Sequence, residues 1–289
     1  MPTHVKTRNE MVEGLRIASC FGIVWFHSGL VIGHDAAQSG LGVFLFLTGY
    51  FFSVATCDRP ALLWNLARQL LLPWAVWSLV FMVTNMLRGH PGASIHLWYL
   101  PYIFLAQAML QILHKNVSKP IYLATVVVLL APFYLLQLHF DGAELISPIP
   151  QYLYATPILL LGVIFGQQKS IATFLLMGAS CIVVCLTSSD NALSYTVAIM
   201  LSVLAISLPV VKIKKGVIAW MSRLTLGIYL VHPLFLSLLK CLFNGVTPIS
   251  ICIAFTASAL FTLGLDNIYR ASYARWSGRM KGTMVAPLR

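Results

Sequence analysis

Residues 14–29, GLRIASCFGIVWFHSG, decide the fold class, because they form an apolar segment that also contains two ionisable side chains. A membrane-crossing α-helix needs about 20 predominantly apolar residues, and the run from 11 to 33 supplies them. Arg16 and His27 interrupt that run. Ionisable side chains inside a bilayer are costly and usually mark a functional path, so this segment is also the first candidate site.

The composition extends this interpretation to the whole chain of 289 residues. It is 59% hydrophobic and 9% charged, whereas a soluble domain has about 25% charged residues. No long hydrophilic stretch interrupts it, so we predict one integral membrane domain over residues 1–289. No clear small-residue cleavage site follows the first apolar run, so we interpret that run as a retained span rather than a signal peptide.

The six cysteines and the placement of the basic residues behind the net charge of +11 argue against a metal-binding protein and a nucleic-acid-binding protein. Most of the cysteines lie in apolar runs and form no CxxC or Cys/His pattern, so we interpret them as buried apolar residues and expect no metal site. The basic residues occupy short loops between apolar runs, which is typical of membrane topology. We therefore expect membrane lipids as partners and no nucleic acid.

Apolar runs bounded by turn signals predict an all-α, polytopic membrane protein with about ten transmembrane helices. The predicted spans are 11–33, 38–56, 68–87, 95–113, 119–138, 150–166, 170–187, 191–211, 217–243 and 248–268.

The distribution of Lys and Arg predicts the direction of these spans. Setting Arg16 aside, sixteen fall on the side that contains both termini, and only Arg88 and Lys240 fall on the other. Because Lys and Arg are retained in cytoplasmic loops, we predict that both termini are cytoplasmic. No internal repeat is evident, unlike in the many transporters that have duplicated halves.

In this topology Arg16 lies in the inner half of the first span and His27 in the outer half. Their separation of eleven residues is close to three helical turns, so both side chains share one face, about 16 Å apart. Imidazole can take and return a proton near neutral pH. Guanidinium binds phosphate or stabilises developing negative charge, so the pair indicates a long phosphorylated donor that enters from the cytoplasm.

Structural interpretations of the two residues stay open. Arg16 can snorkel to the inner headgroups or pair with Glu13, three residues earlier. His27 can be a polar group that packs between helices.

The Arg–ten residues–His spacing resembles the first span of the family-3 membrane acyltransferases. Further stretches resemble that family in the same order, and ten spans is the number typical of it. They are GVFLFLTGYFFS (42–53), HLWYLPYIFLAQ (96–107), YLYATPILLLGVIFG (152–166) with its Gly162-x-x-x-Gly166 pair, and MSRLTLGIYLVHPLF (221–235), similar to the Ser-x-x-Ser-x-Gly-x-Tyr-Leu-x-His motif.

The resemblance implies transfer of an acyl group, usually acetyl from cytoplasmic acetyl-CoA, to a hydroxyl of a sugar or a lipid-linked glycan. It implies no permanently bound cofactor and a location in the bacterial cytoplasmic membrane. His27 would act as general base or accept the acetyl group transiently, and both routes stay open. Arg16 would line the donor channel and stabilise negative charge.

The family often has two basic residues, three apart, before the third span. This chain has Arg68 there, but Asn65 occupies the position three before it. Arg68, assisted by Arg59, is the candidate for binding the donor phosphates.

Two histidines and three aromatic residues are candidate substrate-binding residues. His232 and Tyr229, one turn apart in the ninth predicted span, would line the acyl site, although His232 can instead bond a carbonyl group that Pro233 leaves without its donor. A second group at the outer boundary can stack on a sugar or form an aromatic belt, and it consists of His96, Trp98 and Tyr99.

The alternative function is non-enzymatic transport or flipping of a glycolipid or a small anion. Arg16 and His27 would then be gating charges along a polar path. Release of free coenzyme A in the presence of an acceptor distinguishes an acyltransferase from a transporter.

Overall fold

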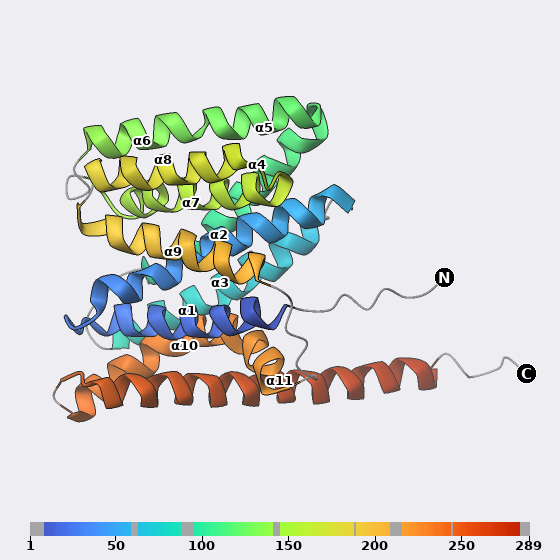
Figure 1. Ribbon diagram of the computed structural model, residues 1–289. Helices are drawn as coiled ribbons and strands as arrows, with labels where there is room; N and C mark the ends of the chain where they lie inside the picture. Colours follow the sequence, from blue (N-terminus) through green and yellow to red (C-terminus); the bar gives the residue numbers. More distant parts are fainter. Residues whose placement is uncertain are drawn as a thin grey trace, which may run out of the picture. The chain divides into compact units, whose positions relative to one another are not determined.

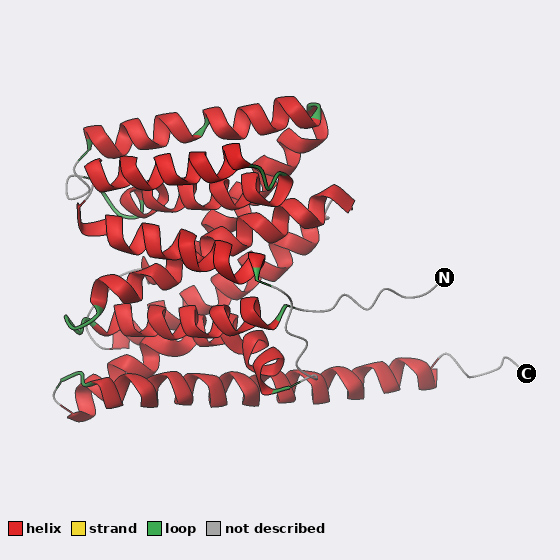
Figure 2. Cartoon of the chain, in the orientation of Figure 1, coloured by secondary structure: helices red, strands yellow, loops and turns green. Residues whose placement is uncertain are grey.

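The fold comes from a computed structural model, shown in Figure 1. It describes residues 9–58, 63–87, 95–140, 145–187, 189–208, 216–243 and 245–283. Figure 2 shows that every secondary-structure element in these ranges is helical, which confirms the all-α prediction. In chain order the helices are α1 (Glu10–Ser28), α2 (His34–Asp58), α3 (Leu63–Leu87), η1 (Ile95–Trp98), α4 (Tyr99–Asn116), α5 (Lys119–Val128), α6 (Leu130–His139), α7 (Ile149–Gln167), α8 (Ile171–Thr187), α9 (Ser189–Ser207), α10 (Val217–Phe243) and α11 (Pro248–Thr283).

Each predicted span overlaps helical residues, but 95–113 includes both η1 and α4, 119–138 includes both α5 and α6, and several boundaries differ for local physical reasons. The first helix ends at Ser28 rather than at 33, because Gly29 and Gly33 adopt left-handed backbone angles with φ of 75° and 73°. The Gly29 N–H caps the helix by donating to the Phe26 carbonyl.

The predicted span 119–138 consists of two consecutive helices, α5 and α6, that break at Leu129. The Leu129 N–H still donates to the Thr125 carbonyl at 2.9 Å. Pro132 follows three residues later and has no N–H to continue the helical hydrogen bonds, so its position explains the break.

The last helix continues fifteen residues beyond the predicted end at 268, to Thr283. No proline occurs within it after Pro248. Arg270 pairs with Asp266 one turn earlier at 2.9 Å, a spacing that supports a helix. Part of the basic C-terminal segment is therefore helical rather than a loop.

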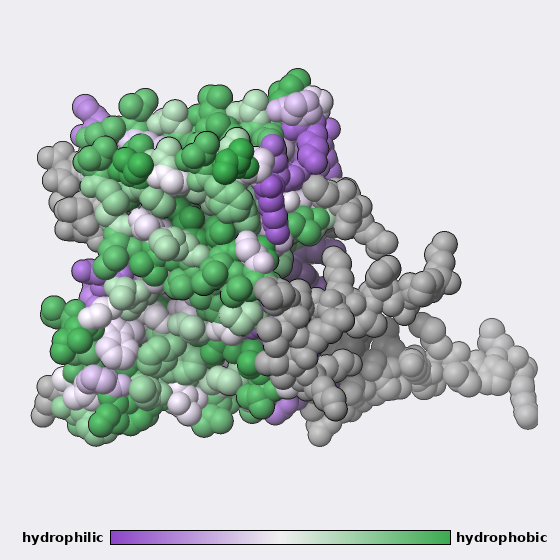
Figure 3. Space-filling view, viewed as in Figure 1, coloured by the Kyte–Doolittle hydropathy of each residue, from purple (hydrophilic) through white to green (hydrophobic). Residues whose placement is uncertain are grey.

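Six helical stretches are long and apolar enough to cross a membrane. Large apolar side chains on these stretches, such as Leu79, Leu135 and Leu260, are exposed. Figure 3 shows a mostly hydrophobic visible surface, which suits contact with lipid tails and not with water. The chain is a polytopic integral membrane protein. The six stretches are residues 34–55, 63–87, 119–139, 149–167, 217–243 and 248–270.

The described helices form two compact units. The first contains α1, α10 and α11, and the second contains α2 to α9, with the division after His34 and near residue 210. We call them the α1–α10–α11 unit and the α2–α9 unit.

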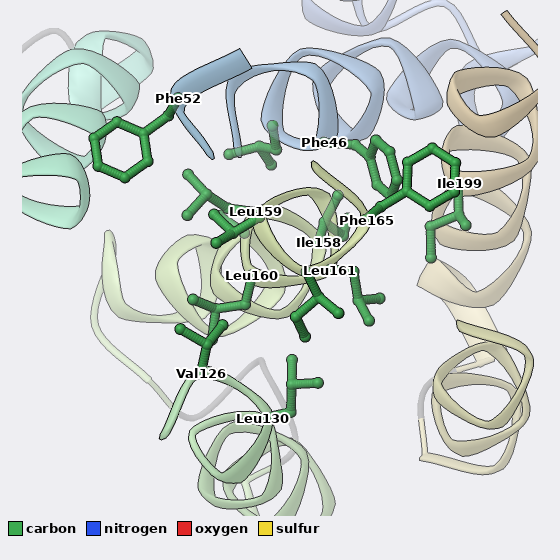
Figure 4. Close-up of a cluster of buried hydrophobic side chains, with 14 of the residues drawn as sticks. Phe46, Phe52, Val126, Leu130, Ile158, Leu159, Leu160, Leu161, Phe165 and Ile199 are labelled. Atoms are coloured by element: carbon green, nitrogen blue, oxygen red, sulfur yellow. The ribbon is translucent and has the colours of Figure 1, made fainter. Parts of the chain in front are cut away.

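Helix α7 forms the centre of the α2–α9 unit. From Ala155 to Phe165 almost all of its side chains are buried, on every face. Figure 4 shows these side chains surrounded by apolar groups of other helices, among them Phe46, Val126 and Ile199. An interior helix of this kind is apolar all round rather than amphipathic.

Glycines allow α2 and α7 to touch backbone to backbone. A Cβ atom added to Gly162 would lie 2.1 Å from the Phe46 carbonyl oxygen, and one on Gly49 would lie 2.1 Å from the Leu159 carbonyl oxygen. Gly166 continues the contact one turn later, against Tyr50. The Gly-x-x-x-Gly pair of the sequence is therefore a helix-packing element, as small residues often are in membranes.

Gly162→Ala should therefore lower the stability of the protein. The new methyl group would force two backbones apart, and overpacking of this kind costs about 1–3 kcal/mol. Thermal melting in detergent would measure the change. Gly178→Ala in α8 is the matched control, because nothing lies within 4 Å of its added Cβ. Equal melting temperatures for the two variants would contradict the packing role of Gly162.

Candidate active site

The α1–α10–α11 unit is organised around the contact between α1 and α10. The two helices are joined by contacts between Glu13 and Ser222, between Cys20 and the Thr225 carbonyl, and between His27 and His232. Residue numbers rise together along both helices, so α1 and α10 run parallel.

Helix α11 packs against the same pair and explains one glycine of the sequence motif. A Cβ atom on Gly227 would lie 2.1 Å from Cγ2 of Thr262, so only glycine lets α11 approach α10 this closely. Phe21 of α1 meets Phe255 of α11 edge to face, with ring centroids 5.4 Å apart. Helices α10 and α11 therefore both contact α1.

At one end of the contact, a buried carboxylate holds Arg16. Glu13 is only 8% exposed. Its Oε2 atom accepts a hydrogen bond from the Ser222 hydroxyl and lies 3.3 Å from Nη1 of Arg16. The pairing of Arg16 with Glu13, one of the structural alternatives left open by the sequence, is thus present, and it leaves about a third of the Arg16 side chain (35%) exposed.

At the other end, two histidine rings lie side by side. The centroids of His27 and His232 are 5.2 Å apart, with 40° between the ring planes. His27 is exposed, whereas His232 is completely buried. Phe26 packs edge-on against His27 at 5.4 Å. An accessible imidazole is therefore backed by a buried one.

The backbone of α10 fixes the orientation of His232. Nδ1 of His232 lies 2.8 Å from the Tyr229 carbonyl oxygen. In an ordinary helix that carbonyl would accept from the N–H of residue 233, but Pro233 has no N–H. His232 supplies the missing donor. This is the bond that the structural interpretation of His232 predicted, to a carbonyl group that Pro233 leaves without its donor. The same side chain also lies beside His27.

The two leading candidates therefore lie on one unbroken helix, and both ends of that helix face are supported by α10. At a rise of 1.5 Å per residue, Arg16 and His27 are about 16 Å apart along the axis. Tyr229 belongs to the same group, because it is buried and its ring centroid lies 6.1 Å from that of His232.

The other predicted residues belong to the α2–α9 unit or lie outside the described residues. Arg68 is exposed on α3. His96 is on η1, but its side chain is outside the described part of the chain, as is the whole of Arg59.

Trp98 and Tyr99 take part in an aromatic cluster. Trp98 is half-buried, and its ring centroid lies 5.8 Å from that of Tyr102 and 5.7 Å from that of Tyr152. Tyr102 and Tyr152 stack on each other at 5.2 Å. The Tyr99 hydroxyl lies 3.2 Å from that of Thr48. Packing within the α2–α9 unit therefore accounts for much of this aromatic cluster, and Trp98 is not completely buried by it.

Two members of the cluster around Arg16 were not chosen from sequence. Glu13 entered only as an alternative partner, although its position three residues before Arg16 was an available signal. Ser222 is 209 residues away from Glu13 and gives no local signal of their contact. Among the side chains that the structure describes, no group of three His, Cys, Asp or Glu could hold a metal ion.

The family model for the acyltransferase domain of acyltransferase family 3 matches residues 9–266. The chain belongs to this family. The match includes both compact units and agrees with the resemblance seen in the motifs of the sequence. Comparison with curated proteins and with solved structures gave no match.

Glu13→Ala should destabilise the α1–α10 contact and lower acyl transfer. The change removes the shared partner of Arg16 and Ser222, and leaving a buried polar group unsatisfied costs about 1–3 kcal/mol. Glu13→Gln keeps an oxygen acceptor at this position, so it should retain more stability. Thermal melting in detergent would measure both variants.

The control is Asp266→Ala, which breaks the exposed pair with Arg270. Exposed pairs contribute less than about 1 kcal/mol, so its melting temperature should stay near that of the parent. If the Glu13→Ala variant had the same melting temperature as the Asp266→Ala variant, the buried carboxylate would be dispensable for stability.

Proposed function

We propose that this family-3 acyltransferase is an O-acetyltransferase that moves acetyl from cytoplasmic acetyl-CoA to a hydroxyl of a sugar or a lipid-linked surface glycan. The observation that supports it best is the exposed imidazole of His27, held on α1 against the buried His232. In an acyltransferase such a group is suited to accept the proton of an attacking hydroxyl.

We also propose ten spans with both termini in the cytoplasm of a bacterium, as the Lys and Arg distribution predicts. The parallel packing of α1 and α10 supports this, because the first and ninth spans would both run outward. The charges that make α1 less apolar, Glu13 and Arg16, neutralise each other, which lowers the cost of placing them in a membrane.

The proposed chemistry centres on His27. It takes the proton of the acceptor hydroxyl while the oxygen attacks the thioester carbonyl carbon. A carbon–oxygen bond forms, the carbon–sulfur bond breaks, and coenzyme A leaves as a thiolate that recovers the proton from His27. In the two-step route His27 first carries the acetyl group and the acceptor then removes it. Neither route requires a metal.

Arg16 has a supporting electrostatic role in this proposal. Its guanidinium is oriented by Glu13 and partly exposed, so it can stabilise negative charge on the donor. Arg68, with Arg59, would bind the donor phosphates. A further set would contact the acceptor or line the acyl site, and it consists of His96, Trp98, Tyr99 and Tyr229. His232, which is completely buried, would border this site behind His27.

Membership of an acyltransferase family favours this function over transport. Thioester consumption separates the two possibilities. An acyltransferase releases free coenzyme A when its acceptor is present, and a transporter does not.

His27→Ala should abolish most acetyl transfer while the protein still inserts into membranes. General acid–base catalysis contributes typically 10²–10⁴-fold, so we expect a loss of at least about 10²-fold. Membranes would be supplied with radiolabelled acetyl-CoA and a lipid-extracted glycan fraction, and the label in glycan would be counted.

His139→Ala is the matched control for this experiment, because His139 is an exposed histidine at the end of α6. It should transfer label at the parent rate. Parent-level transfer by His27→Ala would refute the proposed mechanism. Absence of coenzyme A release by the parent across a panel of glycan acceptors would refute the acyltransferase function itself.

A further inference from the structure

We propose that His232 is a positioning residue that orients His27 and sets its tautomer, an inference that rests on the proposed function of His27. The two rings are neighbours across the α1–α10 contact, at 5.2 Å between centroids. His27 is exposed and His232 is completely buried, so the substrate can reach only the first of them from the accessible side.

The tautomer of His232 follows from its backbone bond. A carbonyl oxygen only accepts hydrogen bonds, so Nδ1 must donate an N–H to the Tyr229 carbonyl, 2.8 Å away, with the Ile228 carbonyl also at 3.2 Å. A charged imidazolium is costly in a fully buried site. The neutral ring with a proton on Nδ1 therefore has a lone pair on Nε2.

This lone pair gives His232 a specific effect on its neighbour. Nδ1 is directed to the backbone of α10. Nε2 is then the nitrogen left to accept an N–H of His27, whose ring centroid lies 5.2 Å away. The second nitrogen of His27 is then unprotonated and oriented to accept the proton of the acceptor hydroxyl. A base held by a third group in this way is the general arrangement of catalytic histidines.

Pro233 has a part in this arrangement. It removes the donor that would otherwise occupy the Tyr229 carbonyl, and that vacancy is what His232 fills. The sequence His232-Pro233 thus combines a positioning side chain with the backbone break that fixes its orientation.

Two isosteric substitutions separate positioning from mere support of the helix. His232→Asn places an N–H donor where Nδ1 was, so it keeps the bond to Tyr229 but has no group at the position of Nε2. His232→Gln places an amide at the position of Nε2 and loses the Nδ1 donor. A purely structural histidine would be replaced well by Asn and badly by Gln.

We expect the opposite order in kcat. His232→Asn and His232→Ala should lose roughly 10- to 100-fold in kcat, as loss of an orienting group typically does, with the KM for acetyl-CoA within about threefold of the parent. His232→Gln should recover at least about threefold over His232→Asn. Steady-state release of coenzyme A from the purified full-length protein, with glycan acceptor present, would provide both constants.

Pro233→Ala provides a second test that does not depend on removing the histidine. It restores the helical N–H to the Tyr229 carbonyl, which competes with His232. We expect a melting temperature equal to or above that of the parent, together with a lower kcat. A purely structural role of His232 would not couple these two changes in opposite directions.

The outcomes separate the two proposals. Parent-level kcat in both His232→Asn and Pro233→Ala, with His27→Ala inactive, would overturn the positioning role and leave the proposed function standing. Parent-level kcat in His27→Ala would overturn both.

Discussion

The contact between α1 and α10 is the interaction on which the arrangement of the α1–α10–α11 unit depends. A carboxylate on α1, Glu13, is buried, and it contacts Arg16 of its own helix and Ser222 of α10. Breaking such a cluster leaves a charge without partners in an apolar environment, which is more costly than losing an exposed ion pair. The register of the two helices is therefore strongly specified, and the same register brings His27 beside His232.

The α2–α9 unit is stabilised by a different means. Its centre, α7, contacts α2 through glycines, with the two backbones too close to admit a Cβ atom at Gly49 or Gly162. In lipid the hydrophobic effect does not drive helices together, so close backbone packing supplies the attraction.

Much of the fold and part of the site could be predicted from sequence, since both rest on local patterns. Apolar runs between turn signals located the helical segments. The differences were helix ends decided by a glycine or a long proline-free stretch, and the break between α5 and α6 near Pro132. The spacing of Arg16 and His27 placed them on one helix face by periodicity alone. The order of motifs along the chain indicated the family that the family model then matched.

What the sequence by itself determined was thus the helical class, the membrane environment and the two ionisable residues of the first helix, because each follows from residues close together in the chain. The tertiary structure alone decided that Ser222 holds Glu13 across 209 positions, that His232 stands behind His27, and that one motif glycine faces Thr262. Contacts between distant segments depend on how whole helix surfaces fit together, and no local pattern of residue types records that fit.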